Sequence, residues 1–414
     1  MIQLLPHQET VLAQTKEFQR VAYYLDMGLG KTFLGSGKIH QLDTPVALLI
    51  CQKSKIEDWA NHFNDHYAYN IIVFNKQLIS EIPEHSVLII NYDRVWRRPE
   101  LLKLTNFTLM LDESSCIKNE TCKRSKFILK LRADNVILLS GTPTGGRYEE
   151  LWSQCKLLGW KISKKLFWDQ FIETRTDILN GFPVKIVTGY KNVDHLKAKL
   201  REYGAVFMKT EDVLTLPETI HTVTPVQCTK EYRRFRNDRI LEMNGKTLIG
   251  DTPLTRLLYL RQLAGMYNPN KLERLRELFE STQDRIIVFY NFNHEYEFIQ
   301  QLCEKLDKPI STVNGQIKDL THYQSTSNSV TLVQYQAGAM GLNLQLANKI
   351  IYFSLPLSSE LYEQSKKRIH RIGQTKTCFY YYLLTTGTIE YQIMDTLKQR
   401  KDFTDYLFKE VCDD

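Results

Sequence analysis

Four residues near the N-terminus have the types and spacing of a phosphate-binding loop. They are Gly28, Gly30, Lys31 and Thr32, within the string Asp-Met-Gly-Leu-Gly-Lys-Thr. Glycines let successive backbone N–H groups turn toward an anion, a lysine reaches the outer phosphates, and a threonine hydroxyl can bind Mg²⁺. The general pattern G-x-x-x-x-G-K-[ST] has a further glycine where this chain has Leu25. An ordinary glycine turn before Lys-Thr would give the same residues, so other groups must decide.

An acidic pair, Asp112 and Glu113, follows the apolar run 107–111. Phosphoryl transfer to water needs one carboxylate that holds Mg²⁺ through its water shell and a second that orients and deprotonates the attacking water. We expect Asp112 to take the first role and Glu113 the second. The plain alternative is an acidic pair in a solvated loop.

Further polar residues follow other apolar runs of the first 146 residues. The turn that starts Ser140-Gly141-Thr142 follows the run 136–139 and can carry hydroxyls toward the acidic pair. Polar groups that could contact a nucleic acid follow two more runs, and they are Lys53, Ser54, Asn91 and Tyr92.

A second group of polar residues lies near the C-terminus. Gly341 and Asn343 follow an apolar run, as does Gln336. Arg368 and Arg371 then lie three positions apart in Gln-Ser-Lys-Lys-Arg-Ile-His-Arg-Ile-Gly-Gln, and we expect them on one helical face. A phosphoryl-transfer site that has a lysine and Mg²⁺ still needs a cation on the far side of the terminal phosphate, which arginine supplies with fixed donors.

The elements that must position these groups alternate along the chain. Short β-rich runs are separated by helix-length intervals, first up to residue 146 and again from residue 281. This alternation predicts α/β lobes with parallel sheets, in which ligands gather at the carboxyl ends of the strands. Between the lobes helical patterns predominate. We therefore predict lobe 1 over 1–146, helical protrusions and a linker over 147–280, and lobe 2 over 281–414.

Together these motifs resemble the superfamily-two helicase-like ATPases, most closely the Swi/Snf-type branch. The matching strings are Leu-Pro-His-Gln8, DMGLGKT, ICQKS with Trp59, INYD, LDES, LSGTP and the arginine string. The resemblance extends from Gln8 to Gln374 and implies two RecA-like lobes of the P-loop NTPase class. It also implies ATP as substrate, Mg²⁺ as cofactor, and double-stranded DNA as the track of a translocase that closes and opens an inter-lobe cleft.

The resemblance also assigns roles to single residues. Gln8 would hydrogen-bond the adenine, and Arg371 would be the arginine finger with Arg368 beside it at the phosphates. The turn Ser140, Gly141 and Thr142 would couple the nucleotide site to the nucleic acid. The family usually has two arginines where this chain has Lys209 and Thr210, and Ser115 replaces the residue that commonly contacts the coupling turn.

A basic run in the middle segment has five Lys or Arg residues among residues 230–239. If helical, it has basic groups on more than one face, and some could contact a nucleic-acid backbone. A solvated helix face is the more common explanation.

Composition sets the remaining limits. The 414 residues carry a net charge of +7, with 43% hydrophobic and 24% charged residues, as in globular proteins that can bind polyanions. Eight cysteines without a C-x-x-C pair indicate reduced thiols rather than zinc or disulfides. No signal peptide or membrane span is expected. We expect a cytoplasmic monomer, from a bacterium or in a host cell if viral, that protein partners could target.

Three functions remain open. The first is a translocase on double-stranded DNA, and the second is a strand-separating helicase on DNA or RNA. Only residues 345–362 separate Asn343 from the arginine string, which leaves little room for a strand-separating hairpin and favours the first. The third is a non-catalytic nucleic-acid-binding protein, which the presence of Lys31, Glu113 and Arg371 argues against.

Overall fold

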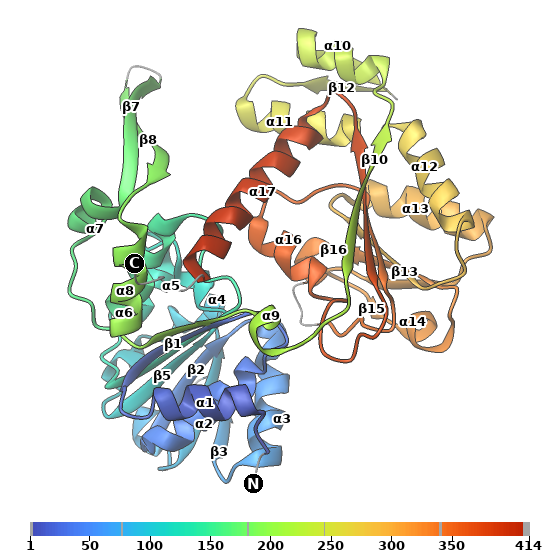
Figure 1. Cartoon of the computed structure of the whole chain (residues 1–414). Helices are drawn as coiled ribbons and strands as arrows, with labels where there is room; N and C mark the ends of the chain where they lie inside the picture. The colour runs from blue at the N-terminus through green and yellow to red at the C-terminus, as the bar shows by residue number, and fades with distance from the viewer. Residues whose placement is uncertain (1–2, 76–77, 180–181, 244, 339–341, 409–414) are drawn as a thin grey trace. The chain divides into compact units, whose positions relative to one another are not determined.

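A computed structural model describes residues 3–75, 78–179, 182–243, 245–338 and 342–408. The chain divides into two compact units, Met1–Leu214 with Asp402–Asp414, and Thr215–Lys401 (Figure 1). Each unit is built around its own parallel sheet. No helix of the described residues is long and apolar enough to cross a membrane.

The first unit contains a seven-stranded sheet in the order β3-β4-β2-β5-β6-β1-β9, with every neighbouring pair parallel. The strands are β1 (Arg20–Leu25), β2 (Val46–Cys51), β3 (Asn70–Val73), β4 (Ser86–Asn91), β5 (Phe107–Asp112), β6 (Asn135–Ser140) and β9 (Ala205–Met208). The two apolar runs predicted before the acidic pair and the coupling turn, 107–111 and 136–139, lie in β5 and β6. Parallel strands need crossovers, and helices supply most of them.

Helices cover both faces of this sheet. The helices are α1 (Pro6–Gln14), α2 (Lys31–Leu42), α3 (Ile56–His66), α4 (Tyr92–Val95), α5 (Lys123–Ile128), α6 (Trp152–Leu157), α7 (Lys164–Phe171), α8 (Val193–Glu202) and α9 (Thr210–Val213). Successive strand residues enter different cores, as the two-residue period of a strand requires. Tyr23 packs in the core with Phe63 of α3, whereas Tyr24 packs in the core with Phe167 of α7.

The second unit has a sheet in the order β10-β18-β17-β13-β16-β14-β15, parallel except for the last pair. Its strands are β10 (Thr219–Val226), β13 (Ile286–Tyr290), β14 (Ile310–Val313), β15 (Lys318–Asp319), β16 (Val330–Gln334), β17 (Lys349–Tyr352) and β18 (Cys378–Thr385). Its helices are α10 (Lys230–Asp238), α11 (Pro253–Ala264), α12 (Pro269–Glu280), α13 (Asn293–Lys305), α14 (Thr321–Ser325), α15 (Tyr335–Gly338), α16 (Ser359–Lys366) and α17 (Ile389–Phe408) as far as Lys401. Both predicted α/β lobes are therefore present.

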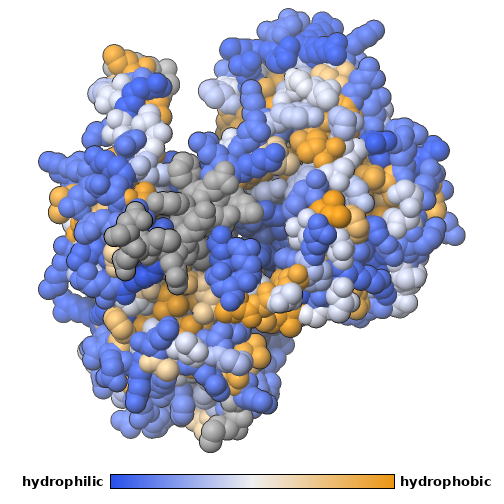
Figure 2. Space-filling model, in the orientation of Figure 1, coloured by the Kyte–Doolittle hydropathy of each residue, from blue (hydrophilic) through white to orange (hydrophobic). Residues whose placement is uncertain are grey.

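The middle segment contains strands that its helical pattern did not predict. The predicted helices are there as α6 to α8 and α10 to α12, but two antiparallel ribbons interrupt them. One is β7 (Ile172–Leu179) with β8 (Phe182–Tyr190), and the other is β11 (Ile240–Met243) with β12 (Lys246–Ile249). The first ribbon extends away from its sheet in Figure 1, and its far end has hydrophobic surface in Figure 2.

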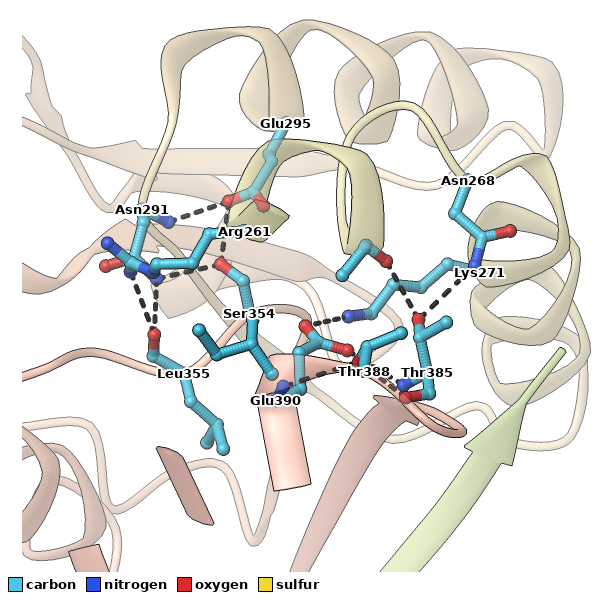
Figure 3. Close-up of polar contacts among 12 residues, drawn as sticks. Arg261, Asn268, Lys271, Asn291, Glu295, Ser354, Leu355, Thr385, Thr388 and Glu390 are labelled. Carbon is cyan, nitrogen blue, oxygen red and sulfur yellow. Dashed lines mark hydrogen bonds and ion pairs between the residues drawn. The ribbon is translucent and has the colours of Figure 1, made fainter. Parts of the chain in front are cut away.

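A buried polar network joins the helices of the second unit to the ends of its strands (Figure 3). Lys271 of α12 donates to Glu390 of α17 at 2.5 Å, with the two side chains 0% and 4% exposed. The other Glu390 oxygen accepts from the backbone N–H of Thr385 at the end of β18. Buried charges are tolerated only when they are paired and hydrogen-bonded, and this pair satisfies both conditions.

Replacing Lys271 by methionine should lower the free energy of unfolding by about 3–5 kcal/mol, because Glu390 would be left as an uncompensated buried charge. The double variant Lys271→Met/Glu390→Gln should recover much of that loss. Urea titration of the full chain measures both values. A single variant within about 1 kcal/mol of the wild type would contradict this role of the pair.

Candidate active site

The predicted phosphate-binding loop connects β1 to α2 at the carboxyl edge of the first sheet. Gly28 and Gly30 have φ of 93° and 74°, in the left-handed region that favours glycine. Gly30 is the N-cap of α2, a helix of 12 residues. The Lys31 ammonium donates to the backbone oxygens of Leu25 at 2.8 Å and Asp26 at 3.2 Å. The loop therefore has the glycine conformations, helix N-terminus and lysine of an anion cradle.

Gln8 of α1 is packed against this loop. Its side-chain nitrogen donates to the Leu29 oxygen at 3.1 Å, and its oxygen accepts from the Leu5 N–H. A Cβ added to Gly30 would lie 2.1 Å from the Gln8 nitrogen, so the Gln8 side chain would have to move, and the φ of 74° independently favours glycine at this position. Gln8 therefore lies beside the loop as predicted, and its contact with adenine stays a prediction.

The start of the loop is held by the segment that follows β9. Asp26 accepts hydrogen bonds from both the backbone N–H and the hydroxyl of Thr210, each at 3.2 Å. Its own N–H donates to the oxygen of Met208. Thr210, at a position where the resembling family usually has arginine, thus anchors the loop through its backbone N–H and its hydroxyl.

The acidic pair lies at the end of β5. One oxygen of Asp112 accepts from the indole N–H of Trp59 at 2.8 Å. Burial raises the pKa of Asp112, and the Trp59 hydrogen bond offsets part of that effect. Glu113 has φ of 57°, uncommon for a residue with a side chain. Because such backbone conformations are concentrated at functional sites, the conformation of Glu113 agrees with the predicted role.

The coupling turn lies next to the phosphate-binding loop because β6 pairs with both β5 and β1. Ser140 is level with Tyr24 of β1, and Leu139 is level with Asp112. A Cβ added to Gly141 would lie 3.2 Å from the Lys31 ammonium nitrogen. Lysine, acidic pair and coupling turn therefore occupy adjacent strand ends, as the sequence predicts.

Gln154 of α6, which the sequence analysis missed, links these parts. Its side-chain oxygen accepts from Ser114 at 2.8 Å and from the Tyr24 hydroxyl at 2.9 Å. Its nitrogen donates to the oxygen of Pro143, in the turn after β6. Since Ser114 follows the acidic pair directly, Gln154 connects that pair to the coupling turn. No local motif marks it.

The four residues of this unit predicted to contact nucleic acid differ in exposure. Lys53 and Ser54 are exposed after β2. The Asn91 side chain caps α4 by accepting from two backbone N–H groups, and the Tyr92 hydroxyl donates to the backbone carbonyl oxygen of Asp112 at 2.9 Å. Asn91 and Tyr92 are thus buried and shape the strand-end surface, and their contact with nucleic acid stays a prediction.

The arginine string of the second unit corrects one prediction. Arg368 and Arg371 do not share a helical face, because α16 ends at Lys366 and the chain continues in turns. Arg368 is buried at 6% exposure, whereas Arg371 is half-buried and donates to the side-chain oxygen of Asn343. Burial lowers the pKa of Arg371. Gln336 is exposed in α15, and Gly341 lies outside the described residues.

Gln374 fixes the geometry of this string. Its nitrogen donates to the backbone oxygens of Gln345, Ala347 and Ile369, and its oxygen accepts from the next two backbone N–H groups. The backbone N–H of Leu344 also donates to the oxygen of Arg368. The segment around Asn343 and the arginine string are therefore joined into one structure.

Comparison with known proteins gives consistent matches. The model of the SNF2-related domain matches residues 23–268, and that of the helicase conserved C-terminal domain matches residues 270–373. A SWI/SNF-related matrix-associated actin-dependent regulator of chromatin subfamily A-like protein 1 of Drosophila melanogaster is 25% identical over 97% of this chain and 55% of its own length. An uncharacterized ATP-dependent helicase of Bacillus subtilis, YqhH, is 21% identical over 96% of this chain and 78% of its own.

A solved structure of the Sulfolobus solfataricus SWI2/SNF2 ATPase core in complex with dsDNA is 21% identical, with a TM-score of 0.46 over 98% of this chain and 92% of that one. The chain spans only 36% to 55% of the length of three relatives it matches. The SNF2-related match alone covers more than half of the chain. The chain therefore belongs to the SNF2-related family and has the Swi/Snf-type ATPase core that its motifs predict.

Proposed function

We propose that this protein hydrolyses ATP and uses the energy to translocate along double-stranded DNA. The observation that supports this most is the placement of Lys31, the acidic pair and the coupling turn on adjacent ends of β1, β5 and β6. Parallel sheets bind nucleotides at such an edge. The names of relatives, which include ATP-dependent helicases and chromatin regulators, agree with a motor acting on DNA.

In the proposed reaction, Glu113 orients the attacking water and accepts its proton. Lys31 of the first unit and Arg371 of the second stabilise charge that develops on the transferred phosphoryl group. Arg368 lies beside Arg371 at the phosphates in this proposal, and the coupling turn links the nucleotide site to the nucleic acid. Hydrolysis on this account requires side chains of both units, so conformational change can accompany each turnover.

Mg²⁺ fits the residues that would hold it. Thr32 at the start of α2 and Asp112 at the end of β5 are oxygen donors, the kind that Mg²⁺ prefers. The ion, when bound, would neutralise phosphate charge. The chain's own contribution is to fix Asp112 through Trp59 and to keep Lys31 at the loop.

Double-stranded DNA is the proposed track because a motor that follows phosphates needs little sequence recognition. Lys53 and Ser54 of the first unit, with Gln336 and Asn343 of the second, are exposed candidates for such contacts. A strand-separating helicase is the competing function.

Removing either cation should abolish hydrolysis. Lys31→Ala and Arg371→Ala should each lower kcat about 10³-fold or more, because each removes transition-state charge stabilisation. Steady-state ATPase assays with saturating DNA measure this. The exposed Arg274→Ala on α12 is the control and should retain full turnover. Normal turnover in Arg371→Ala would contradict the role of the second unit.

The variant Asp112→Asn should lose ATP hydrolysis but should not lose stability. Hydrolysis should fall strongly because a ligand for Mg²⁺ is lost. Stability at pH 7 should rise, since burial raises the pKa of Asp112 and its charged form is therefore disfavoured in the folded protein. Thermal unfolding without nucleotide gives the stability change. A less stable, fully active variant would contradict this assignment.

The track is tested by measuring ATP hydrolysis with duplex DNA, single-stranded DNA, RNA or no nucleic acid. We expect strong stimulation by duplex DNA and weak stimulation by the others. Strong stimulation by single strands alone would favour the strand-separating helicase. Hydrolysis that no nucleic acid changes would contradict a motor function.

A further inference from the structure

The basic run of the middle segment forms α10. The outer face of α10 has an excess of basic residues, whereas basic and acidic residues pair on α12. Lys230, Arg233, Arg234 and Asn237 follow the spacing i, i+3, i+4 and i+7, so they share one face. Tyr232 and Phe235, on the opposite side, are 2% and 0% exposed. All four outer residues are exposed. Three of the five basic groups of the run therefore lie on one outer face, whereas Arg236 and Arg239 lie outside it.

The helix is held by a small core of its own. Tyr232 and Phe235 pack with Leu241 and Leu248 of the ribbon β11–β12 and with Leu260 of α11. The Tyr232 hydroxyl also accepts from the backbone N–H of Ile389 at 2.9 Å. The basic face is therefore presented on a rigid support within the second unit. In Figures 1 and 2, α10 lies at the outer end of this unit, where the surface is hydrophilic.

The charge on this support is concentrated. Residues 230–264 contain eight Lys or Arg and four Asp or Glu, an excess of four positive charges in a chain whose net charge is +7. In the part of the chain that the structure describes, the side chains of Lys230 and Arg233 form no hydrogen bond or ion pair. Among the described residues, Arg234 forms an ion pair with Asp238 alone, at 3.8 Å and with both side chains more than half exposed.

This arrangement of basic groups destabilises α10. Lys230, Arg233 and Arg234 lie in its N-terminal half, near the end where the helix dipole favours acidic groups. Like charges three and four residues apart also repel each other. In α12, by contrast, Arg274 lies 3 residues before Glu277 and Arg276 lies 4 residues before Glu280, and both pairs form ion pairs. Paired charges like those of α12 would solvate a helix surface equally well, so solvation alone does not explain the excess of basic groups on α10.

We propose that the outer face of α10, defined by Lys230, Arg233, Arg234 and Asn237, binds the phosphate backbone of duplex DNA as a contact additional to the motor's strand-end surfaces. This inference rests on the proposed function. A rise of about 1.5 Å per residue places Lys230 and Arg234 about 6 Å apart along the helix, so long side chains can reach neighbouring phosphates. Arg236 and Arg239, also exposed, extend the positive surface beyond this face.

The test compares two double variants of the full-length chain. Lys230→Gln/Arg233→Gln removes two charges from α10, and Arg274→Gln/Arg276→Gln removes two charges from α12 that are also exposed but ion-paired. Binding of a fluorescent duplex of random sequence is measured between about 50 and 200 mM salt. Each phosphate contact contributes about 0.9 to the slope of log K against log salt concentration.

We expect the α10 variant to reduce the magnitude of this slope by about 1.8 and to weaken binding several-fold, equally for duplexes of different sequence. The α12 control should keep the wild-type slope. Lys230→Arg/Arg233→Lys, which keeps the charges, should also keep it. Hydrolysis of ATP without DNA should be unchanged in all three, and matching circular dichroism melts show that they fold.

Wild-type binding with equal slopes for the α10 and α12 variants would overturn the inference and leave the proposed function intact. A wild-type chain that binds no duplex would overturn both. Binding to phosphatidylserine vesicles that depends on α10, with duplex binding that does not, would overturn the inference in favour of a lipid surface.

Discussion

Strand β6 pairs with β5 on one side and with β1 on the other, and this pairing determines where the chemistry of the first unit lies. Because the three strands are parallel and in register, Asp112, Ser140 and Leu25 end at the same edge of the sheet. The phosphate-binding loop, the acidic pair and the coupling turn are the continuations of these strands. Gln154 then joins the acidic loop to the turn. A shift of one residue in either pairing would separate these groups, so the site depends on the register of the three strands.

In the second unit a single side chain, that of Gln374, positions the proposed site residues, whereas strand pairing positions those of the first unit. Gln374 makes five hydrogen bonds to backbone groups and joins the segment around Asn343 to the turns that carry Arg368 and Arg371. Arginine on a helix would have a fixed direction, whereas here the turns need this additional support. Arg371 donates to Asn343, so the proposed finger and a proposed nucleic-acid contact are directly connected.

Local signals predicted strands β5 and β6, the phosphate-binding loop, the acidic pair and the turn after β6, because each depends on residues close in sequence. Long-range contacts could not be read in this way: Gln154 lies 130 positions from Tyr24 and has no motif. The arginine helix was predicted too long, since the three-residue spacing of Arg368 and Arg371 also fits consecutive turns. Ribbon β7–β8 was missed because its exposed strands mix polar and apolar residues on both faces, which leaves no alternation.

The central claim is movement along intact duplex DNA. A triplex-displacement assay tests it most directly, with a third strand bound to one end of a long duplex and labelled separately from the duplex strands. Translocation along the duplex predicts that ATP, but not a non-hydrolysable analogue, releases the third strand while the duplex strands stay paired. Separation of the duplex strands, or duplex-stimulated hydrolysis without release of the third strand, would contradict it.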